Sequence, residues 1–194
     1  MEIKEKLKDG TKVLVRTLTF DDVEKLMEFY RSLLYEDRKY LKVDVTNRSL
    51  IEKRIKAVEE GTAFRIIALH EENIIAIGLL ELSTEDWRRG QGELRVVVSR
   101  EFQRKGLGMI IIRELYMIAV QQKVDKVISK LMRPQIGPIK VCRKLGFREE
   151  LVIPDYVQDL DKKDQDLVIM ICDIKDLWKE IESFYKDSDW QRCR

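Results

Sequence analysis

Histidine and cysteine are scarce in this chain. There is one histidine, His70, and the three cysteines Cys142, Cys172 and Cys193 are widely spaced, with no C-x-x-C pair among them. Zinc sites and disulfide frameworks need clustered ligands or paired cysteines, so the sequence predicts neither, and no metal site. Free thiols in an odd number are typical of a reducing cytoplasm, which is the localisation we expect.

The chain also lacks an excess of charge of one sign and any long apolar run. Its 37 Lys and Arg residues against 35 Asp and Glu residues give a formal net charge of +2. No bulk field draws the protein to nucleic acid or to a membrane surface, and we expect neither partner. The segment Met1 to Gly10 has no signal-peptide core, and no later run reaches transmembrane length. We expect a soluble protein.

The length of the chain indicates one domain. Its 194 residues suffice for one substantial core but not for two domains of ordinary size. We expect a single domain over 1–194, with its core from about 12 to 173 and a C-terminal helix over 175–186. The charged fraction of 37% is above the usual level and indicates an ion-paired surface.

The apolar patterns predict a mixed order of strands and helices. Alternating or wholly apolar runs favour strands, and a 3.6-residue period favours helices. Strands are expected at 12–18, 64–70, 74–82, 92–99, 126–132, 148–156 and 167–172. Helices are expected at 23–34, 49–58, 107–118, 138–145 and 176–185, with 36–47 as an ordered loop or a short helical turn. A helical crossover makes strands 92–99 and 126–132 parallel.

One stretch combines a strand, a basic turn with glycines, and a helix. Gly92 to Ser99 is short and rich in valine, and Gln103-Arg104-Lys105-Gly106-Leu107-Gly108 follows it ahead of an apolar helical stripe. Backbone N–H groups at a helix start carry partial positive charge, and glycine lets a ligand approach the main chain. The layout indicates a diphosphate site; the alternative is a plain strand-to-helix turn with glycines for tight packing.

A second motif follows, Val141-Cys142-Arg143-Lys144-Leu145-Gly146-Phe147. In this order, with one strand between them, Val96 to Gly108 and this motif resemble the acetyl-CoA signature and the Gly-Phe helix of the GCN5-related N-acetyltransferase family. The resemblance runs from about Lys12 to Asp173. It implies an α+β fold in which a mixed, mostly antiparallel central sheet is flanked by helices, with one parallel strand pair splayed around the cofactor. It also implies acetyl-CoA as cosubstrate.

The resemblance implies which residues hold acetyl-CoA. The main chain of Val96, Val97 and Val98 is expected to pair with the pantetheine arm. Gln135 stands where the family has a cofactor-contacting asparagine. The turn and the helix start are expected to wrap the pyrophosphate through backbone N–H groups; they comprise Gln103, Arg104, Lys105, Gly106, Leu107, Gly108 and Met109.

Acetyl transfer needs a neutral amine, a stabilised oxyanion and a proton for the departing thiolate. Glu93 lies where some members of the family carry a glutamate that acts through water, so it is the candidate base; alternatively it is a solvated carboxylate or a partner of Arg95. A backbone N–H of Val97 or Val98 is the candidate oxyanion donor. Cys142 occupies the position of the family's tyrosine, which makes it the candidate acid, with a small buried core residue as the alternative.

Three further features are weaker. Glu36 to Leu41 resembles a segment of acetyltransferase domains that modify protein lysines, so Tyr40 is a candidate substrate contact or else one tucked aromatic in a surface loop. Tyr156 is a second candidate acid. Residues 87–89, Trp-Arg-Arg, either line the acceptor cleft or belong to an ordinary exposed loop.

The predicted activity is transfer of an acetyl group from acetyl-CoA to a primary amine of a small molecule or a protein. The missing tyrosine leaves open a non-catalytic CoA-binding or regulatory module. A different nucleotide-binding protein is a third possibility, but the turn lacks G-x-G-x-x-G and G-x-x-x-x-G-K-[ST] spacing. A homodimer is also possible, since the apolar side chains of the last helix either close the core or cover a second subunit; they are Leu177, Trp178, Ile181, Phe184 and Tyr185.

Overall fold

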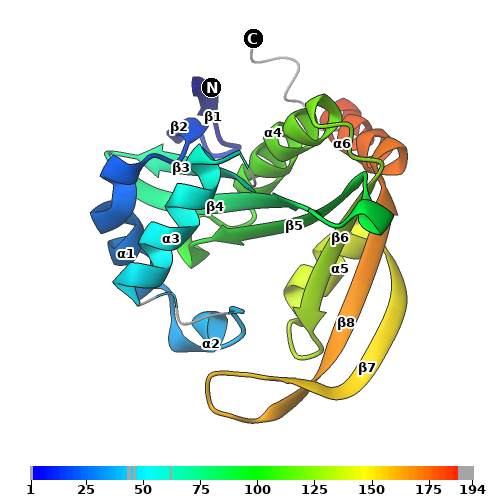
Figure 1. The fold of residues 1–194 in the computed structure, drawn as a ribbon. Helices are drawn as coiled ribbons and strands as arrows, with labels where there is room; N and C mark the ends of the chain where they lie inside the picture. The colour runs from blue at the N-terminus through cyan, green and yellow to red at the C-terminus, as the bar shows by residue number, and fades with distance from the viewer. Residues whose placement is uncertain (1, 43–44, 46, 62, 188–194) are drawn as a thin grey trace.

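The computed structural model describes residues 2–42, 45, 47–61 and 63–187. Over these residues one eight-stranded sheet runs in the order β1-β2-β3-β4-β5-β6-β8-β7 (Figure 1). The strands are β1 (Glu2–Lys6), β2 (Lys12–Thr17), β3 (Ala63–His70), β4 (Asn73–Leu82), β5 (Gln91–Val98), β6 (Lys126–Met132), β7 (Arg148–Gln158) and β8 (Asp164–Asp173).

Helices cover both faces of the sheet. The α-helices are α1 (Val23–Ser32), α2 (Tyr35–Arg38), α3 (Arg48–Glu59), α4 (Leu107–Gln121), α5 (Ile136–Lys144) and α6 (Ile174–Asp187). Short 3-10 turns are η1 (Phe20–Asp22), η2 (Asp86–Arg88) and η3 (Arg100–Phe102). Within the described ranges no helix is both long enough and apolar enough to cross a bilayer.

The predicted fold class is confirmed. Six neighbouring strand pairs are antiparallel, and β5 and β6 form the parallel pair. That pair is short: Gln91, Gly92 and Glu93 lie opposite Lys126, Val127 and Ile128, after which the two strands diverge (Figure 1). The sheet is therefore continuous at one end of β5 and open at the other.

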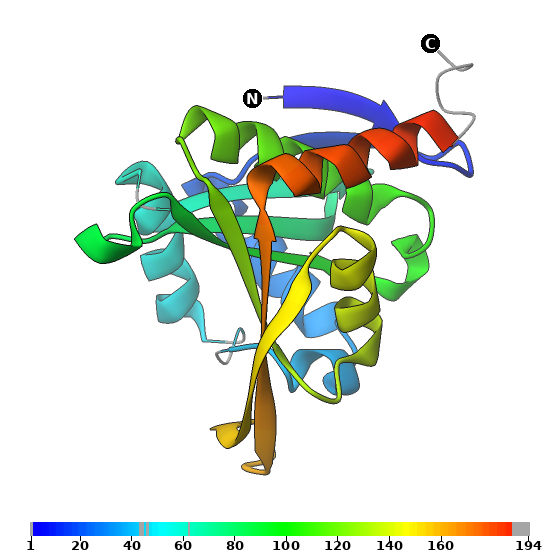
Figure 2. The same ribbon diagram turned by 90° about the vertical axis from the view of Figure 1, so that its right-hand side faces the viewer.

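Two apolar cores hold the sheet between its helices. On one side, α4 buries Leu107, Ile111 and Leu115 completely, as the predicted stripe requires. On the other side, α1 and α3 pack on β3 and β4, with Met27 and Ile51 among the fully buried side chains. In Figures 1 and 2, α6 lies beside α4, and β7 and β8 extend as a long hairpin beyond the rest of the sheet.

Gly78 lets α4 approach the middle of β4 closely. A Cβ atom at this position would lie 2.4 Å from Ile111 Cγ2 and 2.9 Å from Leu115 Cδ1. Contacts this short do not occur in folded proteins, so a larger residue would push the helix away from the sheet. The packing at Gly78 thus fixes where the start of α4 lies relative to β5.

A buried carboxylate ties the start of α1 to β2. Asp22 accepts hydrogen bonds from the two terminal nitrogens of Arg16 at 2.6 and 2.7 Å and from the backbone N–H of Thr19 at 2.9 Å. Burial alone would raise the pKa of Asp22, but the bonds from Arg16 and Thr19 outweigh it and lower the pKa. Thr19 is the N-cap of η1, the short turn that leads into α1.

Several element boundaries differ from the prediction. β1 was not predicted, because Glu2–Lys6 is mostly charged and pairs as an edge strand with only alternate residues half-buried. α3 starts at Arg48, one residue before the expected position 49, and its N-cap is Asn47, whose side chain accepts from the backbone N–H of Leu50 at 3.3 Å. α5 starts at Ile136, since proline is tolerated within the first helical turn.

Candidate functional site

The gap between β5 and β6 exposes the main chain of alternate residues of β5. Ser99 N donates to Ile75 O at 3.0 Å, and Ser83 N donates to Gln91 O at 3.0 Å. In an antiparallel pair such residues alternate with ones whose N–H and C=O point the other way. Since the β4–β5 register is unbroken, odd-numbered residues of β5 bond to β4. Val96 and Val98 therefore turn their main chain toward the gap.

This alternation changes the expectation for Val97. Its main chain faces Ile77 of β4, so its N–H does not reach the gap as an oxyanion donor or as a partner for pantetheine. The Val97 side chain instead packs against the core under α1 and α3. Of the three valines, Val96 and Val98 have the main-chain orientation that the expected role requires.

In β6, the strand on the other side of the gap, the main-chain direction alternates in the same way. Arg133 N donates to Asp166 O at 3.0 Å, so the odd-numbered residues bond to β8 and the main chain of Lys130 and Met132 faces the gap. Met132 is already bonded: its N–H donates to Gln135 Oε1 at 2.8 Å, and its carbonyl accepts from Gln135 N at 2.9 Å. The side-chain oxygen of Gln135 is thus already bonded to β6.

The expected diphosphate turn lies at the start of α4. Arg104 and Gly106 both have positive φ, +61° and +91°, and Gly106 is the N-cap. The N–H groups of Leu107 and Gly108, the first two helical residues, have no partner within the helix. Met109 N instead donates to Gly106 O at 3.1 Å and closes the turn. The backbone N–H groups of this helix start that are available to a ligand are therefore those of Leu107 and Gly108, which precede Met109.

Contacts outside the turn hold it in place. Gln103 Nε2 donates to Val98 O at 3.0 Å, which fastens the turn to the end of β5. Lys105 pairs with Asp9 at 2.9 Å and lowers the pKa of that carboxyl through their hydrogen bond, and Lys105 O accepts from Lys8 N at 3.0 Å. A Cβ atom at Gly108 would meet only Val98 Cγ2, at an ordinary 3.8 Å. The space beside Gly108 is open to a ligand.

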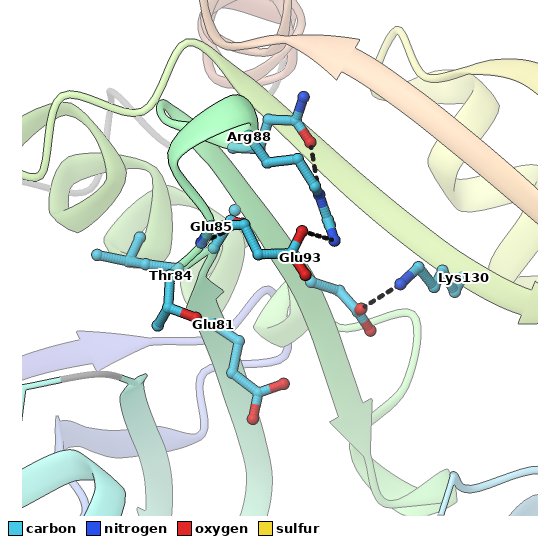
Figure 3. A pocket seen from close by; sticks show the side chains of 10 residues that line it. Glu81, Thr84, Glu85, Arg88, Glu93 and Lys130 are labelled. Atoms are coloured by element: carbon cyan, nitrogen blue, oxygen red, sulfur yellow. Dashed lines mark hydrogen bonds and ion pairs between the residues drawn. The ribbon is translucent and has the colours of Figure 1, made fainter.

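Glu93 is a paired carboxylate at the closed end of the gap. It lines a cavity of about 250 Å³ together with Glu81, Arg88 and Lys130 (Figure 3). Lys42 donates to its carboxylate, Arg95 donates at 2.9 Å, and Lys130 lies at 3.3 Å across the gap. The pairing with Arg95, which was posed as an alternative to the role of base, is confirmed, and the Glu93 side chain, 14% exposed, is not freely solvated.

These cations govern the acidity of Glu93. Burial by itself would raise the pKa of Glu93, but the hydrogen bond from Lys42 and the charges of Lys42, Arg95 and Lys130 lower it. A carboxylate with a lowered pKa is ionised at neutral pH and holds a captured proton weakly. In this arrangement Glu93 is a strong anchor for three cations and a weak base.

A second, larger cavity of about 480 Å³ lies between β6, β8, the end of β7 and the segment after α2. Tyr40 and Tyr156 both line it, together with Gln135 and the two lysines Lys42 and Lys130. The structure thus brings together the substrate candidate Tyr40, the second acid candidate Tyr156 and the cofactor candidate Gln135. We name this cavity the acceptor groove.

Contacts between distant segments join α2 and the residue after it to the tip of the β7–β8 hairpin, close in sequence to the lining residues Tyr40 and Gln158. Tyr35 Oη donates to Asp161 at the tip of the β7–β8 hairpin, Lys39 Nζ lies 3.8 Å from the same carboxylate, and Leu160 N donates to Lys39 O at 3.1 Å. On its other side α2 is held by Asp37, which pairs with Arg100 at 2.8 Å.

Cys142 lies away from these cavities. It is on α5, partly buried against the main core, and does not line either cavity described above. Burial raises the pKa of its thiol, against which a hydrogen bond with Ser129 acts. Its surroundings are those of a core residue, and its role as acid stays a prediction. Cys193 lies outside the described residues.

The loop before β5 contributes one residue. Arg88 lines the cavity beside Glu93 and donates to Gln91 at 3.3 Å, whereas Trp87 is 83% exposed.

The sequence did not predict that Lys42 and Lys130 belong to this site. Lys42 is 51 positions from Glu93, and no local pattern marks it. Across the described ranges, no group of three or more His, Cys, Asp or Glu side chains is placed to hold a metal ion.

Comparison with known proteins places this geometry in a family. The family model described as an acetyltransferase (GNAT) domain matches residues 12–148. A search of curated proteins gives no match.

Among solved structures, the GNAT domain of S. lividans PAT has a TM-score of 0.74 at 17% identity, over 89% of this chain and 96% of its own. The ribosomal-protein-S5-alanine acetyltransferase from Vibrio fischeri gives 0.74 at 13% identity, over 90% and 98%. A GNAT-family acetyltransferase from Streptococcus pneumoniae gives 0.71 at 17%, over 83% and 99%. These structures show a shared fold, and the family match, which spans more than half of the chain, shows that this protein belongs to the GNAT acetyltransferase family.

Proposed function

We propose that the protein transfers the acetyl group of acetyl-CoA to a primary amine of a small molecule or a protein. One observation carries the proposal: the gap between β5 and β6 presents unpaired main-chain groups and lies beside the start of α4. A strand-like ligand arm with a diphosphate at one end matches both features. The cytoplasm is the proposed setting, because the two described cysteines are free thiols.

Acetyl-CoA, when bound, supplies the thioester that is attacked. The N–H groups of Leu107 and Gly108 are proposed to donate to the diphosphate, with Arg104 as a nearby cation. The main chain of Val96 and of Lys130 is proposed to pair with the pantetheine amides, one from each side of the gap. Gln103 has a positioning role, since its side chain holds the turn against Val98 O.

The Val98 N–H is the proposed oxyanion donor. It points toward the gap, and the Val98 carbonyl is already bonded to Gln103, which holds this residue in one orientation. Tyr156 is the proposed proton donor to the thiolate because it lines the acceptor groove, and Cys142 is kept as the alternative. Tyr40 lines the same groove and is proposed to contact the acceptor.

The amine must lose its proton before it attacks. An alkyl ammonium has a pKa of about 10.4 in water, and neighbouring positive charges lower such a value. Lys42 already experiences this effect, since burial and the charges of Arg95 and Lys130 lower its pKa. We propose that the same charges favour the neutral form of the acceptor amine, and that Glu93 holds these cations in place and receives the proton through water.

The proposal is tested by thermal unfolding and thiol release. Acetyl-CoA at about 100 times its dissociation constant adds about 2.7 kcal/mol of stability to a protein that binds it. We expect this stabilisation, together with CoA release in the presence of at least one member of a panel of small amines, lysine peptides and peptides with N-terminal alanine. Stabilisation without any release would favour the CoA-binding module, and neither effect would refute both.

A further inference from the structure

A small cationic cavity lies on the α1 and α3 side of β5. Its volume is about 30 Å³, and its lining combines Tyr30, Lys42, Arg54, Arg65 and Arg95 with the apolar residues Leu41, Val45, Ile77, Leu79 and Val97. Polar cavities of this size hold one or two waters or a small planar group. Its position is the first relevant fact: Val97 lines it, while the flanking Val96 and Val98 turn their main chain toward the acyl site proposed above.

The four cations come from four separate segments, and three of them, Lys42, Arg65 and Arg95, donate hydrogen bonds to neighbouring groups. Arg65, on β3, is 4% exposed; it donates to Arg54 O at 2.7 Å and to Glu81 at 3.2 Å. Arg95, on β5, donates to Glu93 at 2.9 Å. Arg54, on α3, is a lining residue, and its charge acts on both Arg65 and Arg95. The site is therefore a preformed group of donors.

Positive charge exceeds negative charge at this place. Among the described side chains, Glu81 pairs with Arg65, and Glu93 pairs with Lys42, Arg95 and Lys130. Within the part of the chain that the structure describes, five cations against two carboxylates leave an excess of three. Charges held out of water need compensation, and an arginine fork matches a carboxylate in shape and charge. Burial and the nearby charge of Arg54 lower the pKa of both Arg65 and Arg95, as a surplus of cations requires.

We propose that this cavity binds a carboxylate of the acceptor, so that the substrate is an amine with a carboxylate a few bonds from its nitrogen. The inference rests on the proposed acetyl transfer. Lys42 connects the two parts of such a substrate, because it lines both this cavity and the acceptor groove and contacts Glu93. The carboxylate has two possible sources: the α-carboxylate of a free amino acid, or an acidic side chain at a peptide N-terminus.

Matched acceptor pairs test the proposal. Free amino acids are compared with their amides, and peptides that begin with Asp or Glu with those that begin with Asn or Gln, by CoA release at a fixed acetyl-CoA concentration. Charge-assisted hydrogen bonds are worth about 1.5–3 kcal/mol, so kcat/KM is expected to be about 10- to 100-fold higher for the charged member of at least one series. The series that shows the difference identifies the source of the carboxylate.

Variants on α3 locate the effect. Arg54→Gln is expected to remove most of the preference for the charged acceptor while the rate with the neutral acceptor stays within a few-fold. Arg48→Gln is the matched control, because Arg48 lies on the same helix, pairs with Glu24 and Glu52, and does not line the cavity. A preference that survives Arg54→Gln would place the carboxylate elsewhere and overturn the proposal.

Binding without cofactor separates this inference from the proposed function. Calorimetric titration of the CoA-free protein with the same acceptor pairs is expected to show binding of the charged member and at least a tenfold weaker signal for its amide. Equal turnover or equal binding of charged and neutral partners overturns the carboxylate site and leaves the acetyltransferase intact. Failure of acetyl-CoA to bind refutes the proposed function, whereas this titration still decides the carboxylate site.

Discussion

Gln103 and Gln135 close the far ends of the two diverging strands in the same manner. Gln103 donates its side-chain amide to Val98 O at 3.0 Å on β5, and Gln135 accepts from Met132 N at 2.8 Å on β6. Each side chain satisfies a main-chain group that would otherwise face the gap. Between these two residues, the groups that face the gap are the main chain of Val96 and Lys130 and the N–H of Val98, which limits the length available to a strand-like ligand.

The bond from Met132 gives a stability prediction. Gln135→Leu leaves a largely buried N–H without its acceptor, which is expected to cost about 1–3 kcal/mol in the free energy of unfolding. Gln135→Glu keeps an oxygen acceptor and is expected to fall within about 0.5 kcal/mol of the wild type. Urea unfolding of the three proteins measures both values. A Gln135→Leu protein as stable as the wild type would contradict the role of this bond.

The open space beside Gly108 allows binding and folding to be separated. Gly108→Asp places a carboxylate in the first turn of α4, where the helix dipole favours it, so the free energy of unfolding is expected to be unchanged or raised. The same charge repels a diphosphate, and the dissociation constant of CoA is expected to rise at least about tenfold. Gly108→Asn has a similar shape without the charge and serves as control. Equal CoA affinity of the two variants, measured by calorimetry, would remove the diphosphate from this turn.

The Arg16–Asp22 pair predicts a stability that depends on pH. Asp22→Asn is expected to cost about 2–3 kcal/mol, because it breaks a bidentate ion pair of a buried carboxylate. Since the pKa of Asp22 is lowered on folding, its contribution is complete above the unfolded value of about 3.9 and disappears as pH falls through the folded value. Asp21→Asn, at the exposed neighbouring position, is the control. A destabilisation of Asp22→Asn that persists undiminished at pH 2 would argue against this origin.

Glu93 gives a kinetic prediction. Its lowered pKa lies below the unfolded value of about 4.3, so an acid limb of kcat/KM near neutral pH belongs to the acceptor amine and not to this carboxylate. Glu93→Gln is expected to lower kcat/KM at every pH while the midpoint of that limb moves by less than about one unit. Lys42→Met, which removes one of the cations, is the companion variant. Loss of the limb in Glu93→Gln would identify Glu93 as the group that titrates.

Local pattern was enough for most of the fold. The β3–β4 hairpin turns at Glu71 and Glu72, both with positive φ, where the sequence predicted a polar break between two apolar runs. The crossover through α4 fixed the parallel pairing of β5 and β6. β1 was missed because a short charged edge strand gives little apolar signal, and the β7–β8 hairpin is longer than predicted because its tip is charged.

The candidate site was only partly predictable, because it depends on register and on contacts between distant segments. Which of the valines turns its main chain to the gap follows from the pairing with β4, which residue types do not reveal. The cations around Glu93 come from separate segments, and no local sequence pattern predicts that Lys42 lies beside Glu93. The apolar side chains of the last helix were expected either to close the core or to cover a second subunit. Leu177 and Ile181 are fully buried in the core, while Trp178 stacks on Tyr116 and is partly exposed.

The contact between Tyr35 and Asp161 joins α2 to the tip of the β7–β8 hairpin, 126 residues further along the chain. Neither residue belongs to β5, β6 or the start of α4, so this contact and the proposed acetyl-CoA site are built from different parts of the chain. Under the proposed acetyl transfer, a change in the length or sequence of α2 or of the hairpin tip is expected to alter which acceptors enter and to leave the acetyl-CoA side intact. The choice of acceptor and the binding of the acetyl donor are then separable properties of this fold.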